Sequence, residues 1–436
     1  MTSKLAINIA ACISLIVSAC SSEPEQGYDG ALLWFQHREL AKSETAKLTM
    51  ADSTLTLKIA RRELGTFYLA DKVELQLITD SVLGHDGYQI LTNGSQSVKV
   101  QAQTDIALLY GVYDLLRQQN TNAAQIKAHR EIPSYDYRML NHWDNLDGTV
   151  ERGFAGNSIW KWDVLGEDEI KRYKEYARAN ASIGINAVVI NNVNASPDIL
   201  SINYLPKVAK IADILRPYGI KVFLSINFSS PMVLSGLANA DPLNPSVCRW
   251  WRDEVKQIYS LIPDFGGFLV KANSEGLPGP LDYGRTHADG ANMLATALNP
   301  YGGIVLWRAF VYSPSDADRA KQAYLEFKPY DGLFAPNVII QIKNGPIDFQ
   351  PREPFSPLFG ALKKTQMAME LQITQEYTGA ANHICYLPTM WHEALMSDTY
   401  RDGAGSTIAT LTQTKLPRTR KTAIAGVANI GSDNNW

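Results

Sequence analysis

From Tyr135 onward, short apolar runs alternate with longer stretches in which apolar residues recur at helical spacing. This alternation is typical of parallel strands joined by crossover helices. The runs expected to form eight strands span residues 137–145, 186–193, 221–227, 267–273, 304–311, 338–344, 367–374 and 422–430. The intervening helices are expected at residues 167–182, 203–217, 247–261, 317–327 and 390–400, with Gly184 and Gly219 where two of them end. Eight such units predict an α/β fold, a (β/α)8 TIM barrel whose strands all direct their carboxyl ends to one face.

The pattern before the barrel is different. In residues 32–130, apolar and polar residues alternate as in β-strands, and helical stretches occur between them. This pattern predicts a small α+β domain ahead of the barrel domain, residues 131–436. Residues 88–103 are expected to form a hairpin that turns at Asn93-Gly94, a dipeptide that accepts the positive φ angles of a tight turn. Residues 105–118 carry apolar side chains at helical spacing and predict a helix packed on a small sheet.

The first twenty residues resemble an export signal. Lys4 precedes an apolar run over residues 5–17, which is too short to span a membrane as a mature helix, and Ser18-Ala19-Cys20 follows. We expect residues 1–20 to be a lipoprotein-type signal peptide, with Cys20 as the lipidated N-terminus and residues 21–31 as a tether. The alternative is a plain signal peptide with an incidental cysteine. Both kinds of signal peptide predict export. The lipoprotein type also predicts a protein anchored to a bacterial membrane, facing the periplasm or the cell exterior.

Composition and charge exclude several classes of partner. The net charge of -3, without a basic run, argues against nucleic acid. Cys248 and Cys385 are far apart and have no metal-ligand spacing, so neither a disulfide framework nor a zinc site is expected. No glycine-rich phosphate loop indicates a nucleotide cofactor. The histidines form no ligand set or triad and are expected to be structural or rim residues; they include His142, His287, His383 and His392.

Three acidic residues follow predicted strands closely, where a barrel places its chemistry. Glu275 follows the fourth strand, Asp348 the sixth and Glu376 the seventh, each in a polar loop. A single loop acid more often caps a helix. Three at one face instead favour a glycosidase, which needs a protonated carboxylic acid and a carboxylate around the scissile bond.

Cations lie within or at the ends of the same apolar strands, where an unpaired charge is costly: Lys271, Arg308 and Lys343. Ion pairing with the strand-end acids is one explanation, and binding of an anionic substrate is the other. A uronic acid carries a carboxylate that an Arg fork or a Lys ammonium can bind. Trp143 ends the first strand and can either stack on a sugar ring or pack in the core.

The strand-end motifs closely resemble glycoside hydrolase family 67 over nearly all of the mature chain. They are KANSEGLPGP around Glu275, QIKNGPIDFQPREPFSPLFGA around Asp348, LQITQEYTG around Glu376 and GVANIGSD in the eighth strand. Further matches are YRMLNHWDNLDG around Trp143, DYGRTHADGANMLA around His287 and LWRAFVY around Arg308.

The resemblance implies an inverting α-glucuronidase that acts without a metal or cofactor. Glu275 would be the general acid, and Asp348 and Glu376 would position and deprotonate the attacking water. Trp143, Arg308 and Lys343 would surround the uronic acid. The implied substrate is glucuronic acid, or its 4-O-methyl form, α-1,2-linked to the terminal xylose of a xylooligosaccharide released in xylan breakdown.

One departure from the family concerns the C-terminus. Family members continue past GVANIGSD with the last barrel helix and a helical domain that supports dimerisation, whereas this chain ends at Trp436. We therefore expect a barrel that is incomplete at its C-terminus, in which a dimer is possible but lacks its usual region. The alternative function is that of a truncated, inactive family remnant that at most binds uronic acid sugars. A glycosidase with another sugar preference is disfavoured by Arg308 and Lys343.

Overall fold

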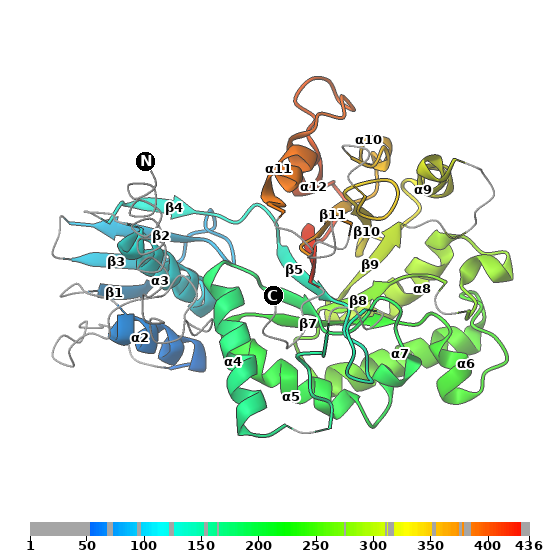
Figure 1. Cartoon of the computed structure of the whole chain (residues 1–436), viewed down its shortest axis with the longest axis horizontal. Coiled ribbons are helices and arrows are strands. Elements are labelled where there is room, and N and C mark those ends of the chain that lie inside the picture. Colours follow the sequence, from blue (N-terminus) through cyan, green and yellow to red (C-terminus); the bar gives the residue numbers. More distant parts are fainter. Residues whose placement is uncertain are drawn as a thin grey trace, which may run out of the picture.

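A small four-stranded domain lies beside a larger closed barrel (Figure 1). The computed structural model describes residues 53–67, 73–93, 97–121, 126–151, 156–163, 165–273, 276–309, 312, 318–350, 355–374, 377–378 and 385–428. The predicted signal peptide, Cys20 and the tether lie outside the described residues. Within the described part of the chain, no helix combines the length and the apolar character needed to cross a bilayer.

Eight parallel strands form the barrel in the order β10-β11-β12-β5-β6-β7-β8-β9. They are β5 Tyr137–His142, β6 Ala187–Val189, β7 Lys221–Ile226, β8 Gly267–Val270, β9 Ile304–Ala309, β10 Val338–Lys343, β11 Met367–Gln372 and β12 Ala423–Ala428. Each falls within a predicted run, and the predicted TIM barrel is confirmed. β12 closes the barrel against β5, with Ala423 opposite Tyr137 and Ala428 opposite His142.

Helices surround the barrel (Figure 1). They are α4 Glu167–Ser182, α5 Leu205–Leu215, α6 Ser230–Ser235, α7 Pro245–Leu261, α8 His287–Leu298, α9 Arg319–Phe327, α10 Leu358–Ala361, α11 Pro388–Met396 and α12 Ile408–Gln413. Short 3-10 turns interrupt the loops and include η4 Arg216–Tyr218 and η5 Pro280–Tyr283. Gly184 and Gly219 have φ angles of 77° and 75°, as expected of residues just past a helix end. The sequence did not predict α8, because it is buried on nearly every side and so lacks the polar stripe that marks an amphipathic helix.

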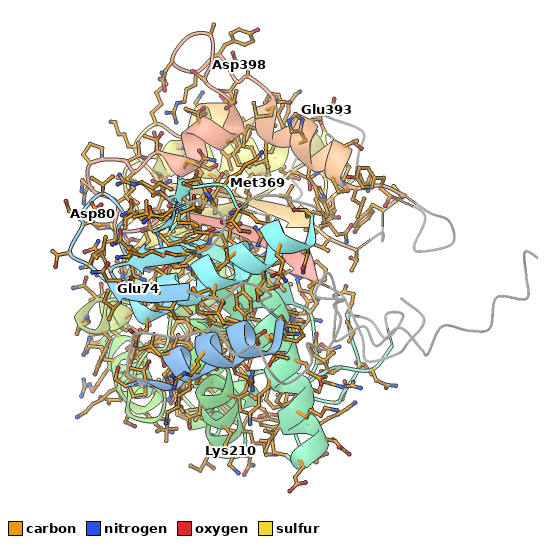
Figure 2. All side chains as sticks on the ribbon, turned by 90° about the vertical axis from the view of Figure 1, so that its left-hand side faces the viewer. Glu74, Asp80, Lys210, Met369, Glu393 and Asp398 are labelled. Carbon is orange, nitrogen blue, oxygen red and sulfur yellow. The ribbon has the colours of Figure 1, made fainter. Side chains whose placement is uncertain are left out.

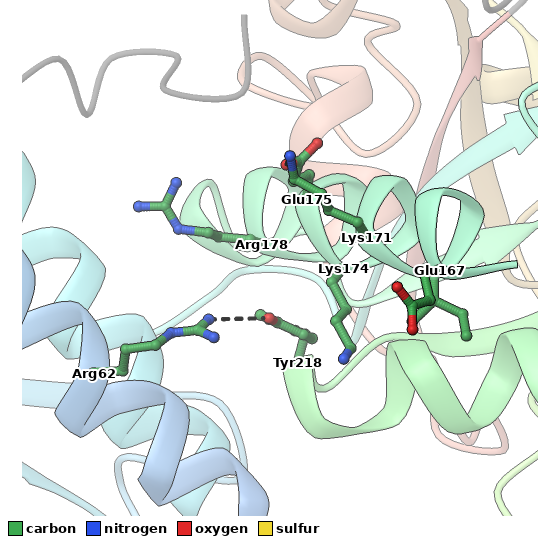
Figure 3. Close-up of a pocket in the computed structure, with 8 residues that line it drawn as sticks. Arg62, Glu167, Lys171, Lys174, Glu175, Arg178 and Tyr218 are labelled. Atoms are coloured by element: carbon green, nitrogen blue, oxygen red, sulfur yellow. Dashed lines mark hydrogen bonds and ion pairs between the residues drawn. The ribbon is translucent and has the colours of Figure 1, made fainter. Parts of the chain in front are cut away.

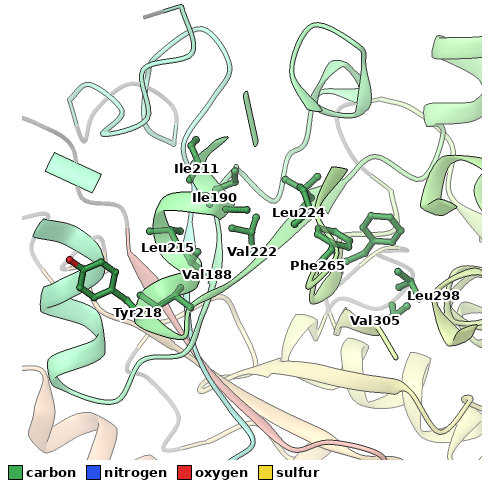
Figure 4. Packing of buried hydrophobic residues seen from close by; sticks show 14 of the residues in the cluster. Val188, Ile190, Ile211, Leu215, Tyr218, Val222, Leu224, Phe265, Leu298 and Val305 are labelled. Carbon is green, nitrogen blue, oxygen red and sulfur yellow. The ribbon is translucent and has the colours of Figure 1, made fainter. Parts of the chain in front are cut away.

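Two apolar layers hold the barrel together. Outward-facing residues of the strands pack against the helices, as Figure 4 shows for Val222 of β7 near Leu215 of α5. Inward-facing residues form a separate cluster inside the barrel; it includes Tyr137, Phe223, Leu269, Ile304, Leu306, Ile339 and Ala368. Apolar side chains therefore make up most of the packing inside the barrel.

The small domain contains helices α2 Leu55–Phe67 and α3 Asp105–Asn120 on a sheet of order β1-β3-β2-β4. Its strands are β1 Val73–Leu77, β2 Tyr88–Thr92, β3 Val98–Ala102 and β4 His129–Glu131. β2 and β3 pair antiparallel, which confirms the predicted hairpin, although Gly94 of its turn lies outside the described residues. In Figure 2 this domain faces the reader, with Glu74 on β1 and Asp80 in the loop that follows.

Polar contacts fasten the small domain to the amino-terminal ends of the barrel strands. Asp86 accepts hydrogen bonds from Arg138 Nη2 of β5 at 2.8 Å and from Asn186 Nδ2, just before β6, at 2.9 Å. Burial alone would raise the pKa of Asp86, but hydrogen bonds from His85 and Arg138 outweigh burial and lower the pKa to about 2. Because Arg138 and Asn186 lie where β5 and β6 begin, the small domain contacts the end of the barrel opposite to the carboxyl ends of the strands, where the catalytic residues are expected.

A buried ion pair adds to this interface. Glu63 of α2, with 1% of its side chain exposed, accepts hydrogen bonds from Arg178 Nε and Nη2 of α4, each at 2.8 Å. Gly219 also lies at the interface, and a Cβ atom on it would come within 2.2 Å of Ile106. Both observations indicate a close-packed contact between the two domains.

Candidate active site

Charged and amide side chains from three neighbouring strands meet inside the barrel. Arg308 of β9, Gln341 of β10 and Glu370 of β11 alternate along their strands with outward-facing residues and share the inward side with Leu306, Ile339 and Ala368. The strand register places Gln341 opposite Arg308. It also places Lys343, which ends β10, opposite Glu370. Four polar side chains therefore occupy one side of the barrel interior.

Arg308 and Glu370 form a buried bidentate ion pair. Arg308 Nε donates to Glu370 Oε2 at 2.9 Å, and Arg308 Nη2 donates to Oε1 at 2.5 Å. The two side chains are only 3% and 0% exposed. Gln341 Nε2 donates to Glu370 Oε2 at 2.6 Å and braces the carboxylate. Burial by itself lowers the pKa of Arg308, but Glu370 outweighs burial and raises the pKa, so the guanidinium remains charged.

Lys343 makes a second ion pair, with Asp348 in the loop after β10. Burial and the nearby positive charge of Arg308 lower the pKa of Lys343 to about 8, although Asp348 and Glu370 act in the opposite direction. Asp348 has a φ angle of 49°, in the left-handed region that residues other than glycine seldom adopt. Such strained backbone is often found at functional sites, and here it accompanies the carboxylate that pairs with Lys343.

Aromatic rings line the same space. The guanidinium carbon of Arg308 lies 5.4 Å from the centroid of the Trp143 ring, within cation–π range. The Phe349 ring lies 6.2 Å from Trp143 and 5.0 Å from Lys343 Nζ. Trp143 thus belongs to the barrel interior and also contacts the charged cluster. Cations beside flat apolar rings can hold a sugar that carries a carboxylate.

The predicted site residues are thus partly brought together. Trp143, Arg308, Lys343 and Asp348 form one cluster, whereas Glu275 and Glu376 lie outside the described residues. Their flanks are described: β8 ends five residues before Glu275, and β11 ends four residues before Glu376.

Ion pairing with a strand-end acid was one of the two explanations offered for these cations, and Lys343 shows it by pairing with Asp348. Arg308 instead pairs with Glu370, which lies within a strand. Lys271 Nζ donates to Asn194 Oδ1 at 2.6 Å, on the side of the barrel where β6 ends.

Sequence reasoning missed Glu370 and Gln341. All six residues of β11 are buried, so Glu370 is a carboxylate within an otherwise apolar buried run. A charge in such a run needs a partner, and this signal could have identified it. Because the sequence analysis considered only acids at strand ends, it did not identify Glu370, the residue that holds Arg308 in place.

The described histidines and cysteines make contacts other than those of the charged cluster. His287 is fully buried, and its Nε2 lies 2.9 Å from Glu326 Oε1. His142 is 2% exposed and contacts Tyr176. Cys248 and Cys385 form no disulfide. Within the described ranges, no group of three or more His, Cys, Asp or Glu side chains is arranged to hold a metal ion.

An amide-rich cleft of about 310 Å³ lies where β5 and β6 end. Its lining includes Asp144, Asn145, Asn191, Asn192 and Asn194. Asn194 also accepts the hydrogen bond from Lys271, which extends the polar surface toward the end of β8. Amide groups both donate and accept hydrogen bonds, as recognition of sugar hydroxyl groups requires.

A larger groove of about 420 Å³ lies between the small domain and α4 (Figure 3). Three of its cations pair with carboxylates, since Arg178 and Arg62 contact Glu63 and Lys171 lies 3.8 Å from Glu175. The groove follows the outside of α4 rather than the carboxyl ends of the strands. The cluster in the barrel therefore remains the candidate active site.

Comparisons with known proteins agree with this arrangement. The model of the glycosyl hydrolase family 67 middle domain matches residues 116–436. Alpha-glucuronidase A of Emericella nidulans is 46% identical over 364 residues, which cover 80% of this chain and 43% of that protein. Alpha-glucuronidase of Hypocrea jecorina is 44% identical over 365 residues, covering 81% of this chain and 43% of its own length. The chain spans less than half the length of these relatives.

Solved structures share the fold at low identity. The GH20 beta-N-acetylhexosaminidase of Streptomyces coelicolor superposes with a TM-score of 0.52 and 12% identity, covering 91% of this chain and 84% of that one. A GH138 enzyme targeting pectin rhamnogalacturonan II gives a TM-score of 0.51 and 16% identity, covering 87% of this chain and 46% of its own. These likenesses show the barrel fold alone. Because the family model covers the whole barrel, the chain belongs to glycosyl hydrolase family 67.

Proposed function

We propose that this chain is the catalytic portion of an inverting α-glucuronidase. Its substrate is glucuronic acid, or the 4-O-methyl form, α-1,2-linked to the terminal xylose of a xylooligosaccharide. The observation that carries the proposal is the buried pair of cations, Arg308 and Lys343, beside the Trp143 ring. Each cation already has a carboxylate partner, Glu370 for Arg308 and Asp348 for Lys343, yet the charge of Arg308 still lowers the pKa of Lys343. The carboxylate of a uronic acid can therefore bind favourably beside both cations, and the relatives named alpha-glucuronidase point to the same sugar.

The reaction is a single displacement. Asp348 or Glu376 takes a proton from water, whose oxygen attacks the anomeric carbon while the glycosidic carbon–oxygen bond breaks. Glu275 gives its proton to the departing xylose oxygen. Lys343, which is paired with Asp348, keeps that carboxylate close to the bound uronate. An inverting geometry requires about 6.5–9.5 Å between the carboxyl groups of the acid and the base, which leaves room for the water.

The substrate class is tested with two matched oligosaccharides. One carries α-1,2-linked glucuronic acid on its terminal xylose, and the other carries glucose in the same linkage. Because the neutral sugar offers Arg308 and Lys343 no carboxylate to bind, we expect its kcat/KM to be at least ~10²-fold lower. Equal rates with both would refute the uronate assignment. Binding of the acidic sugar in calorimetry without turnover would instead support the binding-only remnant.

The mechanism is tested by stereochemistry and by substitution. Proton NMR of the first product should show the β anomer of glucuronic acid, because inversion of an α link gives the β configuration. A first product with the α configuration would refute the single displacement. We expect Glu275→Ala, Asp348→Ala and Glu376→Ala each to lower turnover by ~10²-fold or more. Near-normal hydrolysis by any one variant would remove that residue from the mechanism.

We further propose that the protein is exported and anchored to a membrane through Cys20. The support is the short apolar run followed by Ser18-Ala19-Cys20. Metabolic labelling with a radioactive fatty acid in a bacterial host should label the protein and not its Cys20→Ala variant. Equal labelling of both would refute the anchor, and export without labelling would indicate a plain signal peptide.

A further inference from the structure

The hydroxyl group of Tyr312 joins two neighbouring barrel strands where their backbone pairing ends. The pairing of β8 with β9 extends to Val270 opposite Trp307. Beyond it, the backbone N–H of Ala272 donates to Tyr312 Oη at 3.1 Å. The same hydroxyl donates to the carbonyl oxygen of Arg308 at 2.9 Å. One oxygen therefore continues the connection between the two strands beyond the ladder.

Ala272 and Arg308, the two residues that Tyr312 joins, lie at or close to residues with a proposed role in the reaction. Ala272 stands three residues before Glu275, the proposed general acid. Arg308 is the cation that Glu370 holds in the barrel. We propose that Tyr312 is a positioning residue, which fixes the backbone at Ala272, three residues ahead of the proposed general acid, relative to Arg308. This inference rests on the proposed function of the same site.

A buried network fixes Tyr312 in turn. Its backbone N–H lies 3.4 Å from Glu326 Oε2, and its ring centroid lies 4.9 Å from that of His287. His287 Nε2 lies 2.9 Å from Glu326 Oε1, and Trp307 Nε1 donates to His287 Nδ1 at 3.3 Å. Since Nδ1 accepts, Nε2 carries the proton and donates to Glu326. The ring of His287 also stacks on Phe327 at 4.5 Å.

The hydroxyl stays protonated in this environment. Burial raises the pKa of Tyr312, while the hydrogen bond from Ala272 and the charge of Arg308 act in the opposite direction. Its proton therefore remains available for the carbonyl of Arg308 at neutral pH. The His287 network supports the position of Tyr312 and needs no contact with the substrate.

The test separates positioning of an acid from general stability. Tyr312→Phe removes the hydroxyl and keeps the ring. Departure of xylose requires a proton from the general acid, whereas departure of fluoride from α-glucuronosyl fluoride requires little or none. We therefore expect kcat for the oligosaccharide to fall by ~10-fold or more, while kcat for the fluoride stays within about twofold. KM for the oligosaccharide should change little, because Arg308 keeps its pair with Glu370.

Tyr259→Phe is the matched control. Tyr259 is 7% exposed and donates its hydroxyl to the carbonyl of Phe265 at 2.8 Å, just before β8 begins and at the other end of the barrel. It should lose similar stability with no change in either kcat. Equal slowing of both substrates by Tyr312→Phe, or behaviour like Tyr259→Phe, would overturn the positioning role. Inactivity of the unaltered chain on both substrates would overturn the proposed function, and this inference with it.

Discussion

Replacing Glu370 with glutamine tests the buried ion pair between Arg308 and Glu370. The change keeps the size of the side chain but removes the negative charge that compensates Arg308. It also replaces an acceptor oxygen with an amide N–H group, which must then face a donor on Arg308 or Gln341. At least one of the hydrogen bonds at 2.5, 2.6 and 2.9 Å is lost. A guanidinium that is 3% exposed is left without a counter-charge.

The expected loss of stability in Glu370→Gln follows from the burial of this ion pair. Breaking one side of a buried ion pair costs about 3–5 kcal/mol, because the remaining charge stays desolvated. That amount is a large share of the 5–15 kcal/mol typical of a folded domain. Urea unfolding followed by tryptophan fluorescence should therefore show a clear decrease in the free energy of unfolding. We also expect kcat/KM for a glucuronosyl oligosaccharide to fall by ~10²-fold, because Arg308 loses its fixed orientation.

Glu63→Gln provides the matched control. Glu63 is 1% exposed and binds Arg178 through two hydrogen bonds of 2.8 Å, so the same chemical change is made at the domain interface. Its loss of stability should be similar, with kcat/KM unchanged at temperatures where the variant is folded. The double variant Arg308→Leu with Glu370→Leu should recover most of the stability, since hydrophobic replacement of a whole buried pair is often neutral, but it should not recover activity.

Two results would refute this reasoning. A Glu370→Gln variant with unchanged unfolding free energy would mean that the pair is not the buried, mutually dependent unit described above. Loss of activity in Glu63→Gln equal to that in Glu370→Gln, measured on folded protein, would mean that activity follows stability rather than the orientation of Arg308.

The pKa of Lys343, about 8, predicts that KM for uronate substrates increases as the pH rises from 7 to 9, because the ammonium group loses its proton; a KM that stays constant over this range would contradict it. Burial raises the pKa of Glu254 in α7 to about 7, so between pH 4.5 and 7 the folded state binds more protons than the unfolded state and stability falls with rising pH. Glu254→Gln should therefore be the more stable protein at pH 8, by about 1 kcal/mol or more, and no more stable than the unaltered chain at pH 4, as thermal unfolding would show. A Cβ atom on Gly267, where φ is 136°, would lie 1.9 Å from the carbonyl oxygen of Ile304, so Gly267→Ala should lower the unfolding free energy by about 2 kcal/mol or more. Gly65→Ala, at an exposed helical position with no atom within 4 Å, should raise it by about 0.5–1 kcal/mol, and equal effects of the two glycine substitutions would contradict this explanation.

The barrel could be predicted because each strand is a buried apolar run between polar loops. The predicted runs extend too far at their carboxyl ends. Residues 186–193 were expected to form a strand, but β6 covers only Ala187–Val189, and Ile190 and Val193 remain buried after the ladder ends. Hydrophobicity reports burial and not strand pairing, so it cannot show where neighbouring strands diverge.

The site was predictable to a similar extent. Arg308 and Lys343 were visible as charges in apolar strands, and the structure places them within one cluster. The partner of Arg308 was not found, because Glu370 is 62 residues away in sequence and only the register of three strands brings the two together. A helix buried on nearly every side, such as α8, is hidden for a related reason, since its sequence carries no polar face.

The pairing of β12 with β5 has a consequence for how the chain folds. Tyr137 N donates to the carbonyl of Thr422, and Thr422 N donates to Asp136, so this contact joins residues 286 positions apart. Contacts between such distant segments form late, because a long loop must close before they gain any stability. Until β12 emerges from the ribosome, β5 and β11 remain unpaired sheet edges that can pair with other chains. We expect synthesis to pass through an open, aggregation-prone sheet, on which a chaperone that covers strand edges would act before the barrel closes.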